Sequence, residues 1–443
     1  MLGFAAASTD MLAFAIPASR TDNGSGTIPV TSHYCLLPDS KAKGYDMATE
    51  RFPWGRTFVL GSGFLGISIV WRLFNSLIPP MLEDLGLSAV RVGFIMTWDN
   101  TINMFVEPWV GARSDRTRTR LGRRKPWLLA GAPLAALFFI LVPFVRQNFV
   151  LIALGILSTD VCMALFRSPT IAYLGDLFQP AQRSKANGVI NLMGGVGGAI
   201  AFLGGGALYR LGVPLPFIFG AGAMLVAILI VVWRVQECEQ DPVAAANEPG
   251  LLRSLQMAAA GRRRSGLCLL GAIYAWFVGW EAMEAFFTTY ARDTLGISVG
   301  RATQMPTAFV VPLIVFSIPS GLIATRIGRK ATIMMGLCGM VLGLVAGYLV
   351  RNPVALLGVL AVMGACWALI NINSLPMVYD LCHESSIGAY TGLYYFASSL
   401  AAITGPIVAG RLIDVTSHAV IWPLAAVFML LALVLMSLVQ TYR

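Results

Sequence analysis

Charged residues are scarce in this chain. They make up 12% of its 443 residues, whereas soluble proteins typically carry about 25%. So few charges cannot cover the surface of a water-soluble protein of this length. Hydrophobic residues make up 57%, which excludes a largely disordered chain. The composition therefore indicates an integral membrane protein.

Catalytic and metal-binding patterns are also missing. The three histidines, His33, His383 and His418, lie far apart, and the seven cysteines show no metal-ligand spacing. No Ser or Cys stands out beside a His as a nucleophile. The glycine-rich stretch 194–206 lacks the Lys-Ser/Thr that a phosphate-binding loop needs. We expect no enzyme, no cofactor and no metal.

Runs of about twenty apolar residues are typical of membrane-spanning helices, and they recur along the chain. They predict an all-α integral membrane protein with twelve transmembrane helices in two bundles of six. The runs lie near 57–80, 89–111, 126–145, 149–174, 186–210, 214–233, 266–291, 302–325, 331–350, 353–379, 389–413 and 419–440.

Polar segments divide the chain into four parts. Residues 1–56 form a polar tail, which is either a disordered cytoplasmic segment or an extension ahead of a natural start at Met47. We expect six-helix bundles at 57–233 and 266–443, joined by a cytoplasmic linker at 234–265. The positions of Lys and Arg orient the chain: with both termini in the cytoplasm, 23 of the 32 fall on the inner side. This arrangement predicts a multi-pass protein of the cell (inner) membrane and argues against a nucleic-acid partner.

The two halves resemble each other in sequence. Asp176, Gly188 and Gly206 recur 204 residues later as Asp380, Gly392 and Gly410. A Gly-rich basic loop also follows both the second and the eighth run. Two pseudo-symmetric halves with a central site are typical of secondary transporters.

The repeated loop, Gly-x-x-x-Asp-Arg followed by Gly-Arg-Arg, resembles that of the major facilitator superfamily. The resemblance implies that its charges latch the cytoplasmic ends of the helices together and release them during alternating access. The charges would also satisfy the positive-inside rule without any such role. In the second copy Thr325 takes the place of Asp. The cytoplasmic gate residues predicted from this pattern are Gly111, Asp115, Arg116, Arg123, Arg124, Asp176, Arg326, Arg329 and Asp380.

A narrower resemblance covers residues 57 to about 440. The segment 98–127 contains Arg-x-Arg-x-Gly-x-x-Lys-Pro-Trp and Ser-Asp-Arg. These patterns resemble the glycoside–pentoside–hexuronide:cation symporters and the sucrose:proton symporters with their bacterial relatives. The resemblance implies transport of a sugar or glycoside coupled to a cation.

The second run carries Asp99, Asn103 and Glu107 at intervals of four, which places them on one helical face. Charges inside a membrane are costly, so this face should point into the central cavity. Related symporters hold the coupling ion with carboxylates at this spacing, but here the middle residue is an amide. A sodium site needs several oxygens, whereas a proton needs one carboxylate, so the pattern favours protons over sodium. Glu107 could instead belong to the gate.

The fourth run contains Asp160, Arg167, Pro169 and Asp176. In plant sucrose carriers a span-4 Asp is followed by Pro at +9, Arg at +11 and Asp at +16. Counted from Asp160, Pro169 and Asp176 match the +9 and +16 positions. The +11 position is Ile171, and Arg167 lies about one helical turn before it. The resemblance implies that Asp160 carries the proton and that Arg167 contacts substrate or balances charge. Alternatively, the two residues pair elsewhere and only hold the bundle.

The seventh run places Glu281 and Glu284 on one face, and Arg72 in the first run could neutralise a carboxylate across the cavity. Glu284 could instead reach the outer interface. Aromatic faces and amides suit sugar recognition, although aromatics in spans more often pack or lie at the interface. The candidate sugar contacts are Trp98, Trp276, Trp280, Asn371, Asn373 and Tyr394.

These patterns predict a monomeric secondary active transporter in the lipid bilayer, taking up a small sugar or glycoside with protons. Two alternatives stay open. One is an exporter or antiporter of a drug or non-sugar metabolite, because one fold hosts many functions. The other is a sodium-coupled glycoside symporter.

Overall fold

The computed structural model describes residues 52–178, 180–237, 263–380 and 387–440. Within these residues every regular element is helical and no strand occurs, so the predicted all-α fold is confirmed. Most of the predicted tail and linker lies outside the described residues.

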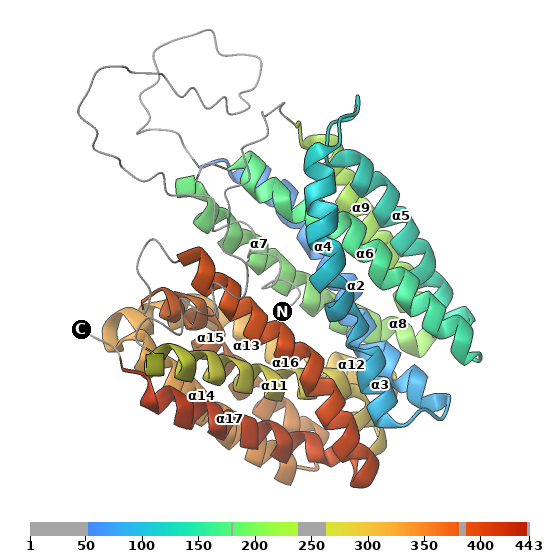
Figure 1. Cartoon of the computed structure of the whole chain (residues 1–443). Helices are drawn as coiled ribbons and strands as arrows, with labels where there is room; N and C mark the ends of the chain where they lie inside the picture. The colour runs from blue at the N-terminus through green and yellow to red at the C-terminus, as the bar shows by residue number, and fades with distance from the viewer. Residues whose placement is uncertain (1–51, 179, 238–262, 381–386, 441–443) are drawn as a thin grey trace, which may run out of the picture.

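Among the residues that the structure describes, the first half contains eight α-helices, arranged as in Figure 1. The first of them begins at Trp54, within the range predicted as tail. The helices are α2 (Trp54–Asp84), α3 (Ala89–Ile95), α4 (Trp98–Arg116), α5 (Lys125–Leu141), α6 (Phe149–Leu177), α7 (Pro180–Ile200), α8 (Gly206–Leu211) and α9 (Leu215–Arg234).

The described part of the second half contains seven α-helices. The short helical turn η5 (His418–Val420) precedes the last of them. The helices are α11 (Arg263–Asp293), α12 (Val299–Gln304), α13 (Thr307–Ile327), α14 (Arg329–Leu349), α15 (Pro353–Tyr379), α16 (Ile387–Val415) and α17 (Ile421–Leu438).

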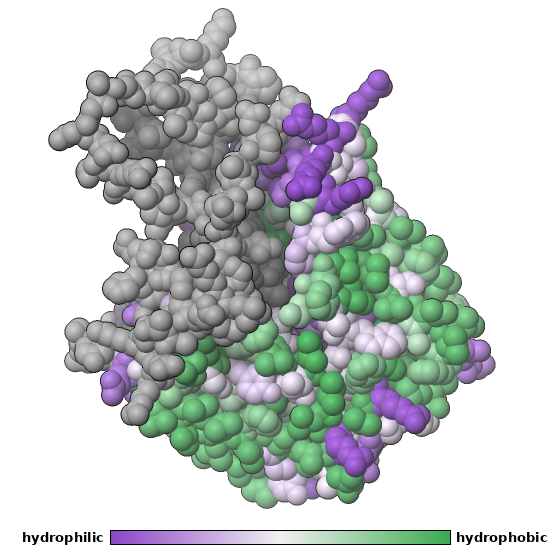
Figure 2. All heavy atoms as spheres, in the orientation of Figure 1, coloured by the Kyte–Doolittle hydropathy of each residue, from purple (hydrophilic) through white to green (hydrophobic). Residues whose placement is uncertain are grey.

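Eleven of the predicted spans correspond to helices that are long and apolar enough to cross a membrane. Where its atoms are coloured, the face in Figure 2 is correspondingly hydrophobic over most of its middle. The other predicted span, 89–111, is broken at Met96 and Thr97 into α3 and α4, and its polar residues lower its hydropathy. We count it as the twelfth crossing, since α2 ends at one face and α5 begins at the other.

The repeated residues have the same structural role in both halves. Gly122 and Gly328 of the repeated loop have φ angles of 111° and 87°. Residues with a Cβ atom rarely adopt a positive φ, which explains why the loop carries glycine at both places. Asn148 and Asn352, which are 204 residues apart, each accept two backbone hydrogen bonds as the N-cap of α6 and α15.

The halves contact each other mainly at one face of the molecule, which we call the closed face. There α3 packs against α16 and α8 against α12 (Figure 1). The carboxylate of Asp414 accepts hydrogen bonds from the backbone N–H of Ala89 (2.6 Å) and of Val90 (3.1 Å), so α16 caps the N-terminus of α3. The opposite face carries the loop 117–124 and is called the basic face.

Candidate functional site

A cavity of about 720 Å³ lies between the two halves. Its wall comes from α2 and α7 of the first half and from α11, α13, α14, α15, α16 and α17 of the second half. Lys185 and Asn187, near the N-terminus of α7, also line it, so the cavity extends toward the basic face. This volume is typical of a site for a small molecule.

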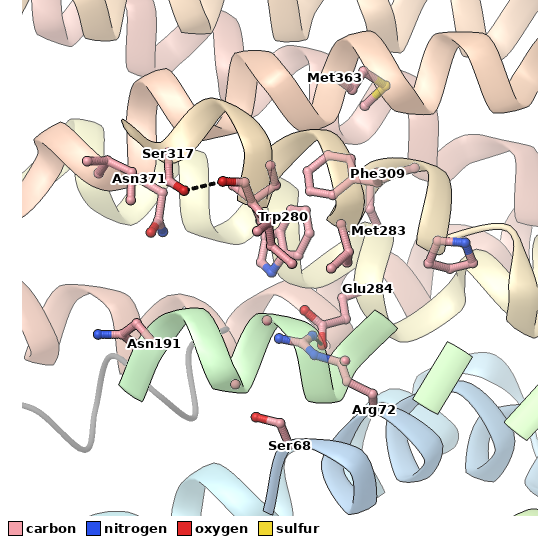
Figure 3. Close-up of a pocket in the computed structure, with 18 of the residues that line it drawn as sticks. Ser68, Arg72, Asn191, Trp280, Met283, Glu284, Phe309, Ser317, Met363 and Asn371 are labelled. Atoms are coloured by element: carbon pink, nitrogen blue, oxygen red, sulfur yellow. Dashed lines mark hydrogen bonds and ion pairs between the residues drawn. The ribbon is translucent and has the colours of Figure 1, made fainter. Parts of the chain in front are cut away.

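An ion pair between the two halves forms part of the cavity wall. Arg72 on α2 pairs with Glu284 on α11, and both side chains are mostly buried. Asn75, one turn further along α2, donates to the same Glu284 carboxylate at 3.0 Å. Figure 3 shows Arg72 and Glu284 meeting between the ribbons, with Met283 and Trp280 on the same helix as Glu284. The partner of Arg72, which the sequence leaves open, is therefore Glu284.

The polar face of α4 is directed toward α6. Glu107 forms an ion pair with Arg167 at 3.1 Å, and only 3% of the Arg167 side chain is exposed. Asp99 accepts a hydrogen bond from Asn100 at 2.8 Å. Asn103 lies between them on this face and is partly buried. These contacts assign Glu107 to a pair inside the bundle.

Asp160 on α6 is nearly inaccessible, with 1% of its surface exposed. Neither carboxylate oxygen has a hydrogen-bond partner among the described residues. It lies within electrostatic range of Asp99. Glu281 on α11 also has one buried oxygen without a partner among those residues, and it lies within range of Asp99, Glu284 and Arg72.

These acidic residues form one electrostatic group at the centre of the molecule. Carboxylates of both halves contribute, and the buried cations near them are Arg72 and Arg167. We call the following five the core carboxylates: Asp99, Glu107, Asp160, Glu281 and Glu284.

Three predicted sugar contacts line the cavity: Trp280, Asn371 and Tyr394. Trp280 stacks on Trp367 with ring centroids 4.8 Å apart. The hydroxyls of Tyr394 and Ser374 are 3.0 Å apart. Figure 3 shows Asn371 beside Ser317 on the wall that faces Asn191.

The other three predicted sugar contacts do not line this cavity. Trp276 is completely buried and packs edge-on against Phe277. The Asn373 amide donates to the hydroxyl of Ser320 and to the Leu369 carbonyl, so it joins α13 to α15. Trp98 packs edge-on against Phe94.

The first copy of the predicted gate forms a dense network at the basic face. Arg124 pairs with Asp176 and with Asp115, and Arg123 reaches Asp176 at 2.7 Å. Burial alone would lower the pKa of the Arg124 guanidinium, but the two carboxylates outweigh it and raise this pKa above its usual value. Gly111 lies one turn before Asp115, where an added Cβ would approach the Ser168 hydroxyl to 3.1 Å. Arg116 is exposed.

The second copy is sparser. Arg329 pairs with Asp380, and both side chains are about two-fifths exposed. Lys330, the counterpart of Arg124, donates instead to the backbone carbonyls of Ser437 and Val439. Arg326 is exposed.

Sequence reasoning missed Glu237, just after α9. Its carboxylate accepts hydrogen bonds from the backbone N–H of Arg123, Arg124 and Lys125 at 2.5–3.2 Å, and from the Tyr173 hydroxyl at 2.5 Å. Glu237 therefore caps α5 from a distant segment. A single acidic residue in a polar linker carries no signal of such a role.

Three potential metal-binding side chains meet at the closed face. The ligand atoms of Glu83, Asp293 and His418 lie within 4.8 Å of one another. Arg292 forms ion pairs with both carboxylates, at 2.8 Å and 2.5 Å. We therefore assign the cluster to an ion-pair network.

Two six-helix halves around a central cavity define a major facilitator transporter. The sequence model of the family described as MFS/sugar transport protein matches residues 59–417, and the chain belongs to that family.

The curated relatives of this chain include sucrose carriers. Sucrose transport protein SUC3 of Arabidopsis thaliana is 27% identical over 161 residues, which cover 32% of this chain and 27% of that protein. Sucrose transport protein SUT1 of Oryza sativa subsp. japonica is 34% identical over 90 residues, or 20% of this chain and 17% of that one. The matches thus span less than a third of these relatives.

Solved structures show the same fold. The nucleoside transporter NupG superposes with a TM-score of 0.67 at 16% identity, covering 88% of this chain and all of NupG. A bacterial homologue of the human lysosomal transporter Spinster, in an inward-facing and unoccupied conformation, superposes with a TM-score of 0.63 at 13% identity. The match covers 88% of this chain and 95% of that one.

Proposed function

We propose that this protein is a proton-coupled symporter that takes up a sugar or glycoside across the cell membrane. The basic face lies in the cytoplasm, as the positive-inside rule requires. The closed face then lies outside, and the cavity opens inward. Sucrose transport by the curated relatives supports a sugar as the substrate.

The observation that carries the proposal is the isolation of Asp160. An ionised carboxylate with 1% exposure and no hydrogen-bond partner among the described residues would be very unfavourable. A bound proton removes that cost. Protonation therefore permits the loaded carrier to reorient, and deprotonation must await access to water.

Protons fit the core carboxylates better than sodium does. Sodium needs several oxygens that converge on one point. Among the described residues, one group of three His, Cys or acidic side chains has its ligand atoms within 4.8 Å of one another. This group is Glu83, Asp293 and His418, and it lies at the closed face. The core carboxylates are instead distributed over α4, α6 and α11, and each can hold a proton separately.

The sugar site lies on the cavity wall formed by α2 and α11. Arg72, Asn75 and Glu284 offer the donors and acceptors that sugar hydroxyls need. Trp280 presents an aromatic surface held by its stack on Trp367, and it suits the C–H side of a sugar ring. Asn371 lines the opposite part of the wall.

Proton movement on sugar addition tests the proposal. Energy-depleted cells expressing the protein receive disaccharides, glycosides and monosaccharides in turn while an electrode records external pH. We expect alkalinisation with one sugar class. Asp160→Asn should abolish this signal and, in energised cells, reduce sugar accumulation at least tenfold. Asp160→Glu keeps a titratable group and should retain part of the signal.

Counterflow of labelled sugar controls for folding, because exchange needs no net proton transfer. Asp160→Asn should keep counterflow while losing accumulation. Acidification on sugar addition would instead indicate an antiporter. Sugar uptake that requires sodium and leaves the external pH unchanged would indicate sodium coupling. The absence of a response to every sugar would exclude a sugar substrate.

A further inference from the structure

Glu281 lies on α11 of the second half, beside the sugar cavity but outside its wall. Trp280 and Glu284, its neighbours on the same helix, line the cavity, whereas Glu281 does not. It lies close to α16, where a Cβ added at Gly405 would be 3.0 Å from the Cβ of Glu281. Asp99 of the first half is within electrostatic range of it. Glu281 therefore lies next to the sugar site and senses charge in both halves.

The two buried arginines are already engaged by other acids. Arg72 pairs with Glu284, and Arg167 pairs with Glu107. Arg72 is also within electrostatic range of Glu281, but its guanidinium contacts the Glu284 carboxylate. The Oε1 atom of Glu281 is buried and has no hydrogen-bond partner among the described residues. An ionised Glu281 would therefore lack the pairing that a buried charge needs, and a bound proton removes this cost.

Asp160 of the first half shows the same isolation, so each half contains one such acid. Both oxygens of the Asp160 carboxylate are buried without a partner among the described residues. Asp99 lies within electrostatic range of both isolated acids. It differs from them because it accepts a hydrogen bond from Asn100 at 2.8 Å and has Arg167 within range. Asp160 is on α6 and Glu281 is on α11, so one proton cannot serve both.

We propose that Glu281 is a second proton-binding residue and that two protons accompany each sugar, one on Asp160 and one on Glu281. The proposal rests on proton-coupled sugar symport as the function of the protein. Each half carries its own proton, and the loaded carrier reorients when both isolated acids are neutral. Ionisation of either acid leaves an unpaired charge within the membrane and opposes reorientation.

The number of protons sets the accumulation that the carrier can reach. The free energy of one elementary charge crossing 100 mV corresponds to a concentration ratio of about 50-fold, and that of two charges to about 2,500-fold. This limit is an equilibrium quantity. It can therefore be measured without reference to the rate of transport.

The membrane potential that balances a sugar gradient measures the number of protons. Purified protein is reconstituted in liposomes at equal pH on both sides, and potassium with valinomycin sets the potential. A tenfold excess of labelled sucrose outside, or of the sugar that the electrode assay identifies, is opposed by an inside-positive potential until net flux is zero. We expect balance at about 30 mV, because two charges move with each sugar, whereas one charge would require about 59 mV.

Two substitutions at one position separate proton binding from folding. Glu281→Gln stays neutral without a proton, so one charge should move and the balance should shift to about 59 mV. Glu281→Asp keeps a titratable group and should stay near the wild-type value. The balance potential does not depend on the amount of active protein, so a merely structural role would leave it unchanged. If Glu281→Gln keeps the wild-type value, the proposal is wrong.

Proton release by the purified protein tests Glu281 without a sugar. The pH of the protein in detergent is raised from 6 to 9, and the protons released per molecule are counted. An ordinary glutamate has already lost its proton at pH 6. We expect Glu281→Gln to release about one proton fewer than the wild type, and equal release would overturn the proposal.

Failure of this proposal and failure of symport give different results. A wild-type balance near 59 mV would mean one proton per sugar, so symport would stand and the second proton would not. Absence of flux with every sugar would remove the proposed function, and the proton count would still decide whether Glu281 binds a proton.

Discussion

The two halves carry the same loop at the basic face but use it differently. In the first half Arg124 is buried and pairs with Asp115 and Asp176, and Glu237 caps the helix that follows. In the second half the side chains of Arg329 and Asp380 are each about two-fifths exposed. The two copies of the sequence therefore share the backbone conformation of the loop, including its glycine with positive φ. They differ in how strongly their ion pairs stabilise the protein.

Burial explains the difference. Removal of one partner from a buried ion pair leaves an uncompensated charge and costs about 3–5 kcal/mol, whereas an exposed pair contributes about 0–1 kcal/mol. The first loop should therefore hold α4, α5 and α6 together as a rigid unit. The second loop leaves α13, α14 and α15 to rely on packing.

The largest expected effect comes from the matched pair Arg124→Ala and Arg329→Ala. Arg124→Ala removes the buried cation and leaves Asp176 with Arg123 as its remaining partner. It should destabilise the protein by about 3 kcal/mol, the lower end for a broken buried ion pair. Arg329→Ala should cost about 0–1 kcal/mol. The apparent melting temperature of the purified protein in detergent measures both. Equal losses would mean that burial does not distinguish the two loops.

A second comparison concerns Gly206 and Gly410, which lie at the closed face in equivalent positions. An added Cβ would come within 2.3 Å of the Gly300 carbonyl oxygen or of the Ala89 carbonyl oxygen, respectively. Overpacking of this kind costs about 1–3 kcal/mol, and here it opposes closure. Both alanine variants should therefore open this face.

Gly410→Ala should have the larger effect of the two. Its Cβ meets only backbone atoms, whereas at Gly206 the flexible end of Gln304 is part of the obstacle. The reaction rate of a buried cysteine at Thr303→Cys with an impermeant maleimide measures opening. An unchanged rate in both variants would show that these glycines are not needed for closure.

The smallest expected effect comes from rebuilding the sparse loop. Thr325→Asp combined with Lys330→Arg restores the residue types found at Asp115 and Arg124. Because this site is exposed, we expect a gain of only about 0.5–1 kcal/mol, again measured as melting temperature. A gain as large as the loss in Arg124→Ala would show that residue type, rather than burial, sets the strength of the network.

Much of the fold could be predicted from the sequence, since apolar length and the distribution of cations are local signals. The pairing of Arg72 with Glu284 could not be, because 212 residues separate them and two nearby acids were equally eligible. The same holds for the capping of α3 by Asp414 and of α5 by Glu237. Each depends on how distant helices pack.

The candidate sugar contacts show a second limit. Residue type suggested both Asn371 and Asn373. Residues two positions apart on a helix point to different sides, so only one of them can face the cavity. Asn371 lines the cavity, whereas Asn373 bonds to Ser320 inside the bundle. Periodicity alone does not say which side of a helix faces the centre when the helix is apolar over most of its surface.

The excess of acid at the centre has an electrical consequence. Five core carboxylates face two buried arginines, so a carrier that has released its protons holds net negative charge within the membrane. Each elementary charge that crosses the field changes its energy by about 2.3 kcal/mol per 100 mV. A potential that is negative inside would then drive the empty carrier back toward the outside, and the voltage would power the return step of the cycle.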